Sequence, residues 1–121
     1  KRGDAARSTL DHLGLVPYLD EVFGANDTPW RKPQPEFSRY VLEKMGSTAE
    51  ESCLVGDSPF DLQSASVVGM PCHLVATGTH DLEQLAQTEA TSVHKDLFVL
   101  AKECFDLDLD PTDPEEIIAS V

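Results

Sequence analysis

The sequence is short of basic residues and has no long apolar run. Nine Lys and Arg residues stand against 22 Asp and Glu residues, so the net charge of the 121-residue chain is −13. A surface this acidic repels nucleic acid and anionic lipid, and we expect neither as a partner. No apolar stretch approaches the roughly 18 residues that a membrane span requires, so we expect no membrane partner either.

Cysteine is also scarce, and its three residues are widely separated, without a C-x-x-C pair or a zinc-binding spacing. Two of them, Cys53 and Cys72, fall in expected strands and are predicted to be small buried apolar residues. This usage favours a reducing compartment, so we expect a cytoplasmic protein. The four histidines are His12, His73, His80 and His94. They are scattered along the chain, so no metal cluster and no base of a catalytic triad can be built from their spacing in the sequence.

Apolar periodicity predicts strands that alternate with helices. The expected strands are residues 21–24, 53–55, 71–75 and 92–94. The expected helices are residues 4–13, 36–45, 59–68, 81–88 and 96–104. Such alternation indicates βαβ units around a parallel sheet in one domain. The segment after residue 104 is acidic, and we expect a solvated extension with a short helix from Pro114.

Two acids four residues apart, Asp57 and Asp61, follow the expected strand at 53–55. A glycine ends that strand, so Asp57 falls at its carboxyl end, the edge where open α/β sheets bind ligands. Pro59 suits the first turn of a helix that would carry Asp61 one turn above the loop. Two convergent carboxylates repel each other unless a cation lies between them, and hard oxygen ligands suit Mg²⁺. A helix N-cap at Asp57 or Ser58, with an ordinary surface acid at Asp61, explains the same residues equally well.

Lys32 lies in a proline-rich loop, residues 25–35. A proline follows it directly and disfavours the helical conformation at Lys32, while Pro35 opens the next helix. Lys32 is therefore expected just before a helix, at the same edge of the sheet as Asp57. Taken by itself, the position of Lys32 would indicate only a solvated lysine in a turn. A loop Lys followed 25 residues later by a strand that ends in Gly-Asp, with a second Asp four residues on, is a much more specific pattern.

This pattern resembles the haloacid-dehalogenase-like (HAD-like) hydrolases, in particular the phosphoglycolate-phosphatase-like branch. The residues that carry the resemblance are Lys32-Pro33 with Pro35, Val55-Gly56-Asp57-Ser58 with Asp61, Ala65, Gly69-Met70, Thr77-Gly78 and Asp96-Leu97. The opening helix and Leu13-Gly14-Leu15 resemble the segment that follows the family's Thr/Ser-Asn motif. The resemblance covers roughly residues 1–104 and leaves the acidic extension, residues 105–121, unmatched.

The resemblance implies an α/β protein with a three-layer α/β/α, Rossmann-like parallel sheet. It also implies an Mg²⁺-dependent phosphatase that acts on a small phosphorylated metabolite similar to phosphoglycolate. In the family an Asp attacks phosphorus, and water then hydrolyses the aspartyl-phosphate. By resemblance, Asp57 would be catalytic as an Mg²⁺ ligand, and Asp61 would bind the metal through water or orient the site. Lys32 would be catalytic and would bind phosphate, and Ser58 would hydrogen-bond near the metal.

The chain departs from the family pattern on its N-terminal side. The nucleophile motif, Asp-x-Asp followed by Thr or Val on the first strand, is absent upstream of Asp57. The phosphate-binding Thr or Ser would fall just before Lys1, and the substrate-selecting cap lies between those two motifs. We therefore expect residues 1–104 to be the C-terminal part of a HAD-like core domain.

Without the nucleophile strand, the sheet would be incomplete. The strands at 53–55 and 71–75 would lose a neighbour, which leaves backbone donors and acceptors unpaired in the core. We expect the 121 residues alone to have no phosphatase activity.

Two other functions fit part of the same pattern. A non-catalytic flavodoxin-like or receiver-like binding module also carries acids at strand ends and a Lys. In receivers, however, the Lys follows the acids, whereas Lys32 precedes Asp57. A HAD-type phosphomutase would share Asp57 and Asp61, and the sequence leaves it open.

Overall fold

The structure is a computed structural model that describes residues 1–109. The chain divides between Arg31 and Lys32 into two compact units, which are described separately below. Within residues 1–109, no helix has both the length and the apolar character that a bilayer crossing requires. The helix expected from Pro114 lies outside the described residues.

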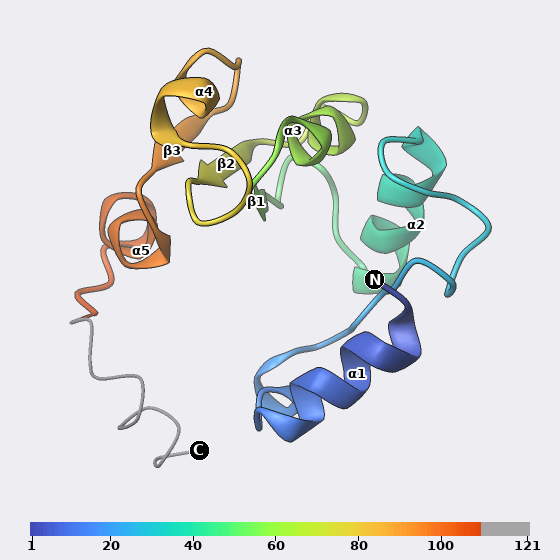
Figure 1. The fold of residues 1–121 in the computed structure, drawn as a ribbon. Coiled ribbons are helices and arrows are strands. Elements are labelled where there is room, and N and C mark those ends of the chain that lie inside the picture. The colour runs from blue at the N-terminus through green and yellow to red at the C-terminus, as the bar shows by residue number, and fades with distance from the viewer. Residues whose placement is uncertain (110–121) are drawn as a thin grey trace. The chain divides into compact units, whose positions relative to one another are not determined.

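The first unit contains helix α1 (Gly3–His12), the 3₁₀ turn η1 (Val16–Tyr18) and a connecting loop (Figure 1). α1 coincides closely with the helix expected at 4–13. The chain leaves this helix through Gly14, whose φ of 70° is easily reached only by glycine. The sequence signal for this helix end is therefore confirmed.

The strand expected at residues 21–24 is wrong, because this segment has no regular structure. Its backbone is held by side chains instead. The Arg7 guanidinium donates to the Val22 carbonyl at 3.2 Å and forms a two-pronged ion pair with Asp27 at 3.0 Å. The Asp27 carboxylate also accepts from the Gly24 N–H at 2.6 Å. A strand needs a neighbouring strand to pair with its backbone N–H and C=O groups, and residues 1–31 contain no strand that could do so.

The second unit contains a three-stranded parallel sheet in the order β1-β2-β3. Its strands are β1 (Leu54–Gly56), β2 (Cys72–Val75) and β3 (Ser92–His94). Its helices are α2 (Pro35–Met45), α3 (Pro59–Ser66), α4 (Leu82–Ala86) and α5 (Leu97–Phe105). Each strand is followed by a helix, so the predicted alternation is confirmed here, with ends that shift by one or two residues.

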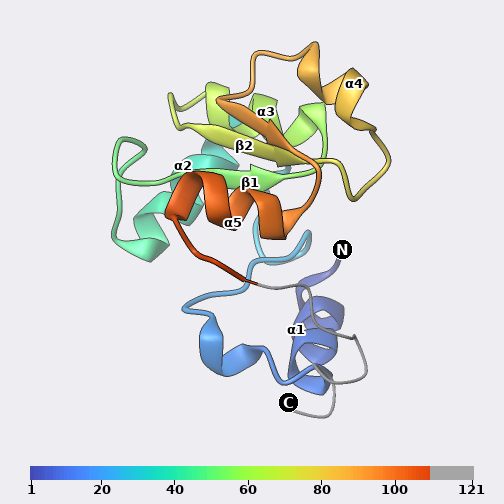
Figure 2. The same cartoon turned by 90° about the vertical axis from the view of Figure 1, so that its left-hand side faces the viewer.

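Helices cover both faces of this sheet. α3 packs on β1 and β2, and α5 packs on β2 and β3. Figure 2 shows α5 in front of the sheet and α3 behind it. The centre of the hydrophobic core is formed by Ala65, Cys72, Leu74 and Leu85. The three-layer α/β/α arrangement predicted from the resemblance is therefore confirmed.

The sheet has two outer strands, β1 and β3, and each of them pairs on one side only. We expected the strands at 53–55 and 71–75 both to lack a neighbour, and this is wrong for the second, because β2 pairs with β1 and with β3. β1 pairs on one side only, and Val55 within it is 41% exposed. Cys53 was expected to be buried, but it precedes β1 and is exposed, whereas Cys72 is buried as predicted.

Candidate active site

The turn between β1 and α3 is stabilised by residues that are close together in the sequence. Ser58 is the N-cap residue with an extended backbone, and Pro59 is the first residue of the helix. Asp61 is the third helical residue, and its carboxylate reaches back to the Ser58 N–H at 3.2 Å, as in a capping box. The cap that we considered as the structural alternative is therefore present. Asp61 is nevertheless no ordinary surface acid, because it is only 7% exposed.

The Asp61 carboxylate joins three parts of the site. One oxygen, Oδ1, accepts a hydrogen bond from Lys32 Nζ at 2.8 Å. The other, Oδ2, accepts from the Asp57 N–H at 3.0 Å and from the Ser58 N–H and hydroxyl at 3.2 and 3.3 Å. Burial alone would raise the pKa of Asp61. The Lys32 and backbone hydrogen bonds outweigh it and hold the pKa below the ordinary value, so Asp61 is ionised at neutral pH.

Two glycines leave room for these carboxylates. A Cβ atom at Gly56 would overlap the Asp61 side chain, and one at Gly78 would overlap the Asp57 carboxylate. Gly78 lies in the turn after β2, so the end of the neighbouring strand helps to shape the site. Only a residue without a side chain lets the backbone approach a carboxylate this closely. Both glycines are therefore part of the site geometry.

Lys32 reaches the site because α2 is fixed against α3. The Ser38 hydroxyl, 5% exposed, donates to the Ser64 carbonyl at 2.7 Å and ties the two helices together. Lys32 lies in the turn just before α2, as predicted, and its side chain is 47% exposed. The ammonium group thus faces Asp61 on one side and solvent on the other.

Asp57 differs from Asp61 in its surroundings. It is exposed, and in the described part of the chain its carboxylate has no hydrogen-bond or ion-pair partner. Its backbone N–H is anchored by Asp61, so the residue has a fixed place on the turn. Asp57 therefore offers open carboxylate oxygens at the carboxyl end of β1.

This donor set fits a hard divalent cation. Mg²⁺ is usually held by one or two protein carboxylates and keeps several waters. The open oxygens of Asp57 suit direct ligation. Both oxygens of Asp61 already accept hydrogen bonds, so Asp61 is better placed to orient the turn and Lys32 than to bind a metal directly. The Ser58 hydroxyl faces Asp61, which places it among the groups that hold this carboxylate.

The structure brings together Lys32, Ser58 and Asp61, with Asp57 on the same turn, while the catalytic and metal-binding roles assigned to them stay predictions. Sequence reasoning missed the contribution of Gly78. The pair Thr77-Gly78 was part of the resemblance, but its contact with Asp57 depends on the pairing of β1 with β2, which no local pattern reveals.

Comparison with known proteins identifies similar chains. The HAD-hydrolase-like family model matches residues 29–100, more than half of the chain. A phosphoglycolate phosphatase of Rhodospirillum rubrum is 34% identical over 91 residues, which cover 75% of this chain and 37% of that protein. A phosphoglycolate phosphatase of Pseudomonas syringae pv. tomato is 31% identical over 99 residues, which cover 82% of this chain and 36% of that protein.

Solved structures share the fold. A HAD-superfamily hydrolase of subfamily IA from Geobacter sulfurreducens superposes with a TM-score of 0.64 at 26% identity. The match covers 78% of this chain and 44% of that one. A predicted phosphatase from Clostridium acetobutylicum superposes with a TM-score of 0.78 at 22% identity, over 88% of this chain and 50% of that one. The chain thus spans between about a third and a half of the length of each of these four proteins.

Proposed function

Since this chain belongs to the HAD-like hydrolases, we propose that it carries part of the active site of an Mg²⁺-dependent phosphatase of small phosphate monoesters. The ion pair between Lys32 and Asp61 is the observation that carries this proposal. It fixes a half-exposed cation on the same carboxylate that anchors the backbone of Asp57. The names of the curated relatives favour phosphoglycolate, or an ester of similar size, as the substrate. A receiver-like binding module loses support because the matching family is one of hydrolases.

Lys32 has the chemistry to bind and stabilise a phosphoryl group. An ammonium group has three N–H donors, and the Asp61 bond uses one of them. The side chain is 47% exposed, so the remaining donors are accessible to phosphoryl oxygens that approach from solvent. A fixed positive charge lowers the energy of the charge that develops during phosphoryl transfer, and a fixed donor needs no reorganisation at that moment. Asp61 is then a positioning residue, because it acts through Lys32.

Asp57 would hold the Mg²⁺ ion. Its carboxylate is open, and Gly78 leaves room for it. When bound, the ion would draw negative charge from the phosphoryl oxygens. Ser58 would keep Asp61 in place through its hydroxyl, rather than contact the phosphate.

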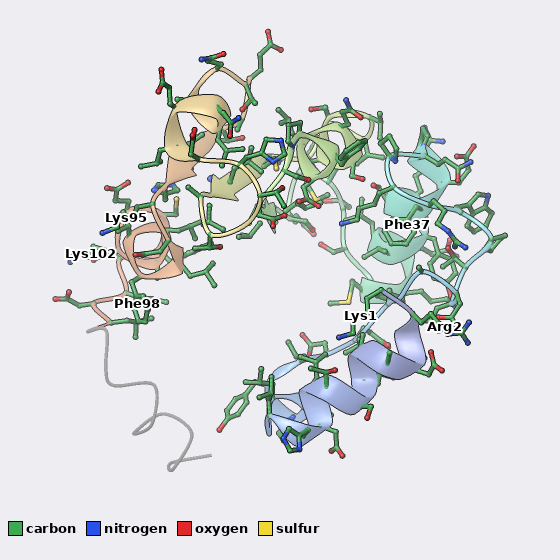
Figure 3. The ribbon with its side chains drawn as sticks, in the orientation of Figure 1. Lys1, Arg2, Phe37, Lys95, Phe98 and Lys102 are labelled. Atoms are coloured by element: carbon green, nitrogen blue, oxygen red, sulfur yellow. The ribbon has the colours of Figure 1, made fainter. Side chains whose placement is uncertain are left out.

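The attacking group would come from a part of the protein outside this chain, as an Asp that forms an aspartyl-phosphate. The open edge of β1 supports this, together with an apolar hollow of about 320 Å³ beside it. Lys32 lines the hollow with apolar residues of α2 and β1, among them Phe37, which Figure 3 shows on α2, and Leu54. A strand paired with β1 would therefore lie next to Lys32 and Asp57.

The test is phosphatase activity of the intact protein with Mg²⁺, on p-nitrophenyl phosphate and on phosphoglycolate. Lys32→Ala should lower kcat by about 10²-fold or more, as for the loss of one preorganised charge. Asp57→Asn should raise the Mg²⁺ concentration needed for half-maximal activity. The matched controls are Lys95→Ala and Asp108→Asn, which change exposed residues of the same type elsewhere.

Unchanged turnover in both variants would refute the assigned roles. Equal losses of activity in the variants and in their controls would show a general effect of the protein's charge, and they would also contradict the roles assigned to Lys32 and Asp57. The 121-residue chain alone should be inactive with either ester, and Mg²⁺-dependent hydrolysis by the purified chain would overturn that expectation.

A further inference from the structure

A second cluster of metal-binding side chains lies on the α5 face of the sheet. His73 in β2, His94 in β3 and Cys104 in α5 each offer one ligand atom, and these three atoms lie within 4.8 Å of one another. The Cys104 Sγ is 3.7 Å from His73 Nδ1 and 3.5 Å from His94 Nε2. The proposed phosphatase chemistry uses none of these groups.

Sheet register explains why the three residues meet. His73 is paired with Ser92 across β2 and β3, so the two lie side by side. His94 is two residues after Ser92 and therefore points to the same face of the sheet. α5 packs on β2 and β3 and lies over one face of the sheet (Figure 2). Its residue Cys104 contacts both histidines, so they lie on this face. The arrangement thus rests on regular secondary structure rather than on a loop.

The Ser92 hydroxyl lies between the two imidazole rings. Its Oγ is 2.5 Å from His73 Nδ1 and 2.6 Å from His94 Nε2. It is also 3.7 Å from the Cys104 sulfur. One polar atom therefore sits at the centre of the three donors, in the place where a cation would interact with all of them.

Glu103 completes the surroundings of His94. Its Oε2 lies 2.8 Å from His94 Nδ1, although the N–H is not aligned for a hydrogen bond. His94 is 4% exposed, and within residues 1–109 this buried nitrogen has no hydrogen-bond partner. A carboxylate behind a metal-binding histidine fixes the ring and makes the opposite nitrogen a better ligand. Once the Nδ1–H is aligned with the Glu103 carboxylate, Nε2, the nitrogen on the Cys104 side, is left to bind the metal.

We propose that His73, His94 and Cys104 form a Zn²⁺ site, with the fourth position left to Ser92 or to a water molecule. Two imidazoles and a thiolate are borderline-soft donors, which select Zn²⁺ over Mg²⁺. Tetrahedral Zn²⁺ with bonds of about 2.0 Å to nitrogen and 2.3 Å to sulfur requires nitrogen–sulfur distances of roughly 3.5 Å. The observed distances of 3.5 and 3.7 Å meet this requirement. The Ser92 hydroxyl would leave the centre of the three donors and either take the fourth position or give way to a water molecule, and the thiol would release its proton on binding.

Cys104, His94 and Glu103 also have the order of a thiol nucleophile, its base and an orienting acid. The second imidazole favours the metal site over this alternative. His73 Nδ1 also lies within hydrogen-bond distance of the sulfur, at 3.7 Å, and the Ser92 hydroxyl lies between the two rings. The sulfur is thus enclosed by three polar groups, which suits coordination better than attack on a substrate. The experiment below separates the two.

The test is titration of the metal-free intact protein with Zn²⁺, and with Co²⁺ as a spectroscopic probe, in excess Mg²⁺. We expect one Zn²⁺ per chain and a thiolate-to-Co²⁺ charge-transfer band. Cys104→Ser should abolish the band and weaken Zn²⁺ binding by at least tenfold, and His73→Gln, a partly exposed position, should weaken it similarly. The matched controls Cys53→Ser and His80→Gln should bind as the unaltered protein does, because both residues lie in other parts of the fold.

Several results would overturn the proposal. These are the absence of stoichiometric Zn²⁺ binding, a charge-transfer band that persists in Cys104→Ser, or a band that disappears in Cys53→Ser. Zn²⁺ should also protect Cys104 from iodoacetamide, and a thiol that is alkylated faster than Cys53 with or without Zn²⁺ would instead indicate a nucleophile. Asp57→Asn should leave Zn²⁺ binding unchanged, so a failure of the phosphatase proposal and a failure of this one are distinguishable.

Discussion

Removal of Asp61 should cost far more stability than removal of its partner Lys32. Asp61→Ala deletes the acceptor of four hydrogen bonds, three of them from the β1–α3 turn. Lys32→Ala deletes one donor and leaves the other three bonds in place. The two sides of one ion pair are therefore unequal, because one is buried and structural while the other is 47% exposed.

The magnitudes follow from these contacts. The Lys32 side chain is half-exposed, and ion pairs of such side chains contribute at most about 1 kcal/mol to the free energy of unfolding. In Asp61→Ala, two backbone N–H groups in a partly buried site would lose their charged acceptor. Each loss should lower the free energy of unfolding by roughly 1–2 kcal/mol. The capping box would be lost with them. We expect a loss of about 3 kcal/mol for Asp61→Ala against about 1 kcal/mol for Lys32→Ala.

The assay is urea denaturation of the two variants and the unaltered protein, with the free energy of unfolding compared between pH 3 and pH 7. The folded protein holds the pKa of Asp61 below 3.8, so the stabilisation is complete above that value and is lost as the pH falls through the lower, folded-state pKa. The gap between the unaltered protein and Asp61→Ala should therefore narrow in acid. Equal losses in the two variants, or a gap independent of pH, would refute the reasoning.

Three further predictions concern the surroundings of the site. Gly78→Ala should push the Asp57 carboxylate aside and lower phosphatase activity by on the order of tenfold or more, measured as kcat at saturating Mg²⁺; full activity would contradict the contact. Cys53 should react with a thiol reagent well before Cys72, because burial raises the pKa of the Cys72 thiol to about 11; the order of labelling by mass spectrometry decides this. Ser38→Ala should cost about 1–2 kcal/mol in urea denaturation, because a buried carbonyl of α3 loses its donor, and an unchanged midpoint would refute it.

Most elements of the second unit could be predicted from local patterns. Pro35 and Pro59 open helices, Gly46 and Gly69 follow them with positive φ angles, and the apolar runs between them form strands. These signals act within a few residues, so the sequence contains them in full. The strand expected at 21–24 was wrong because a strand must pair with another strand that can lie far away in the sequence. Local residue patterns do not indicate whether such a pairing strand is present.

The candidate active site was predictable in part. The spacing of Asp57 and Asp61, and Lys32 before a proline, indicated that one cation and two acids would meet at one edge of the sheet. The 2.8 Å contact between Lys32 and Asp61 bears out that meeting for one of the acids. The difference between the acids, one buried and saturated with hydrogen bonds and the other open, was not visible in the sequence. It depends on the fold of the β1–α3 turn around Asp61 and on the packing of α2 against α3, which brings Lys32 to the same carboxylate.

The sequence by itself determined the alternation of strands and helices in the second unit and the capped turn after β1, because each depends on neighbours along the chain. Only the tertiary structure decided which carboxylate is buried, why Gly78 matters, and that His73, His94 and Cys104 converge. These residues are separated by up to 31 positions, and parallel strand pairing and helix packing set their distances. No local pattern encodes such distances.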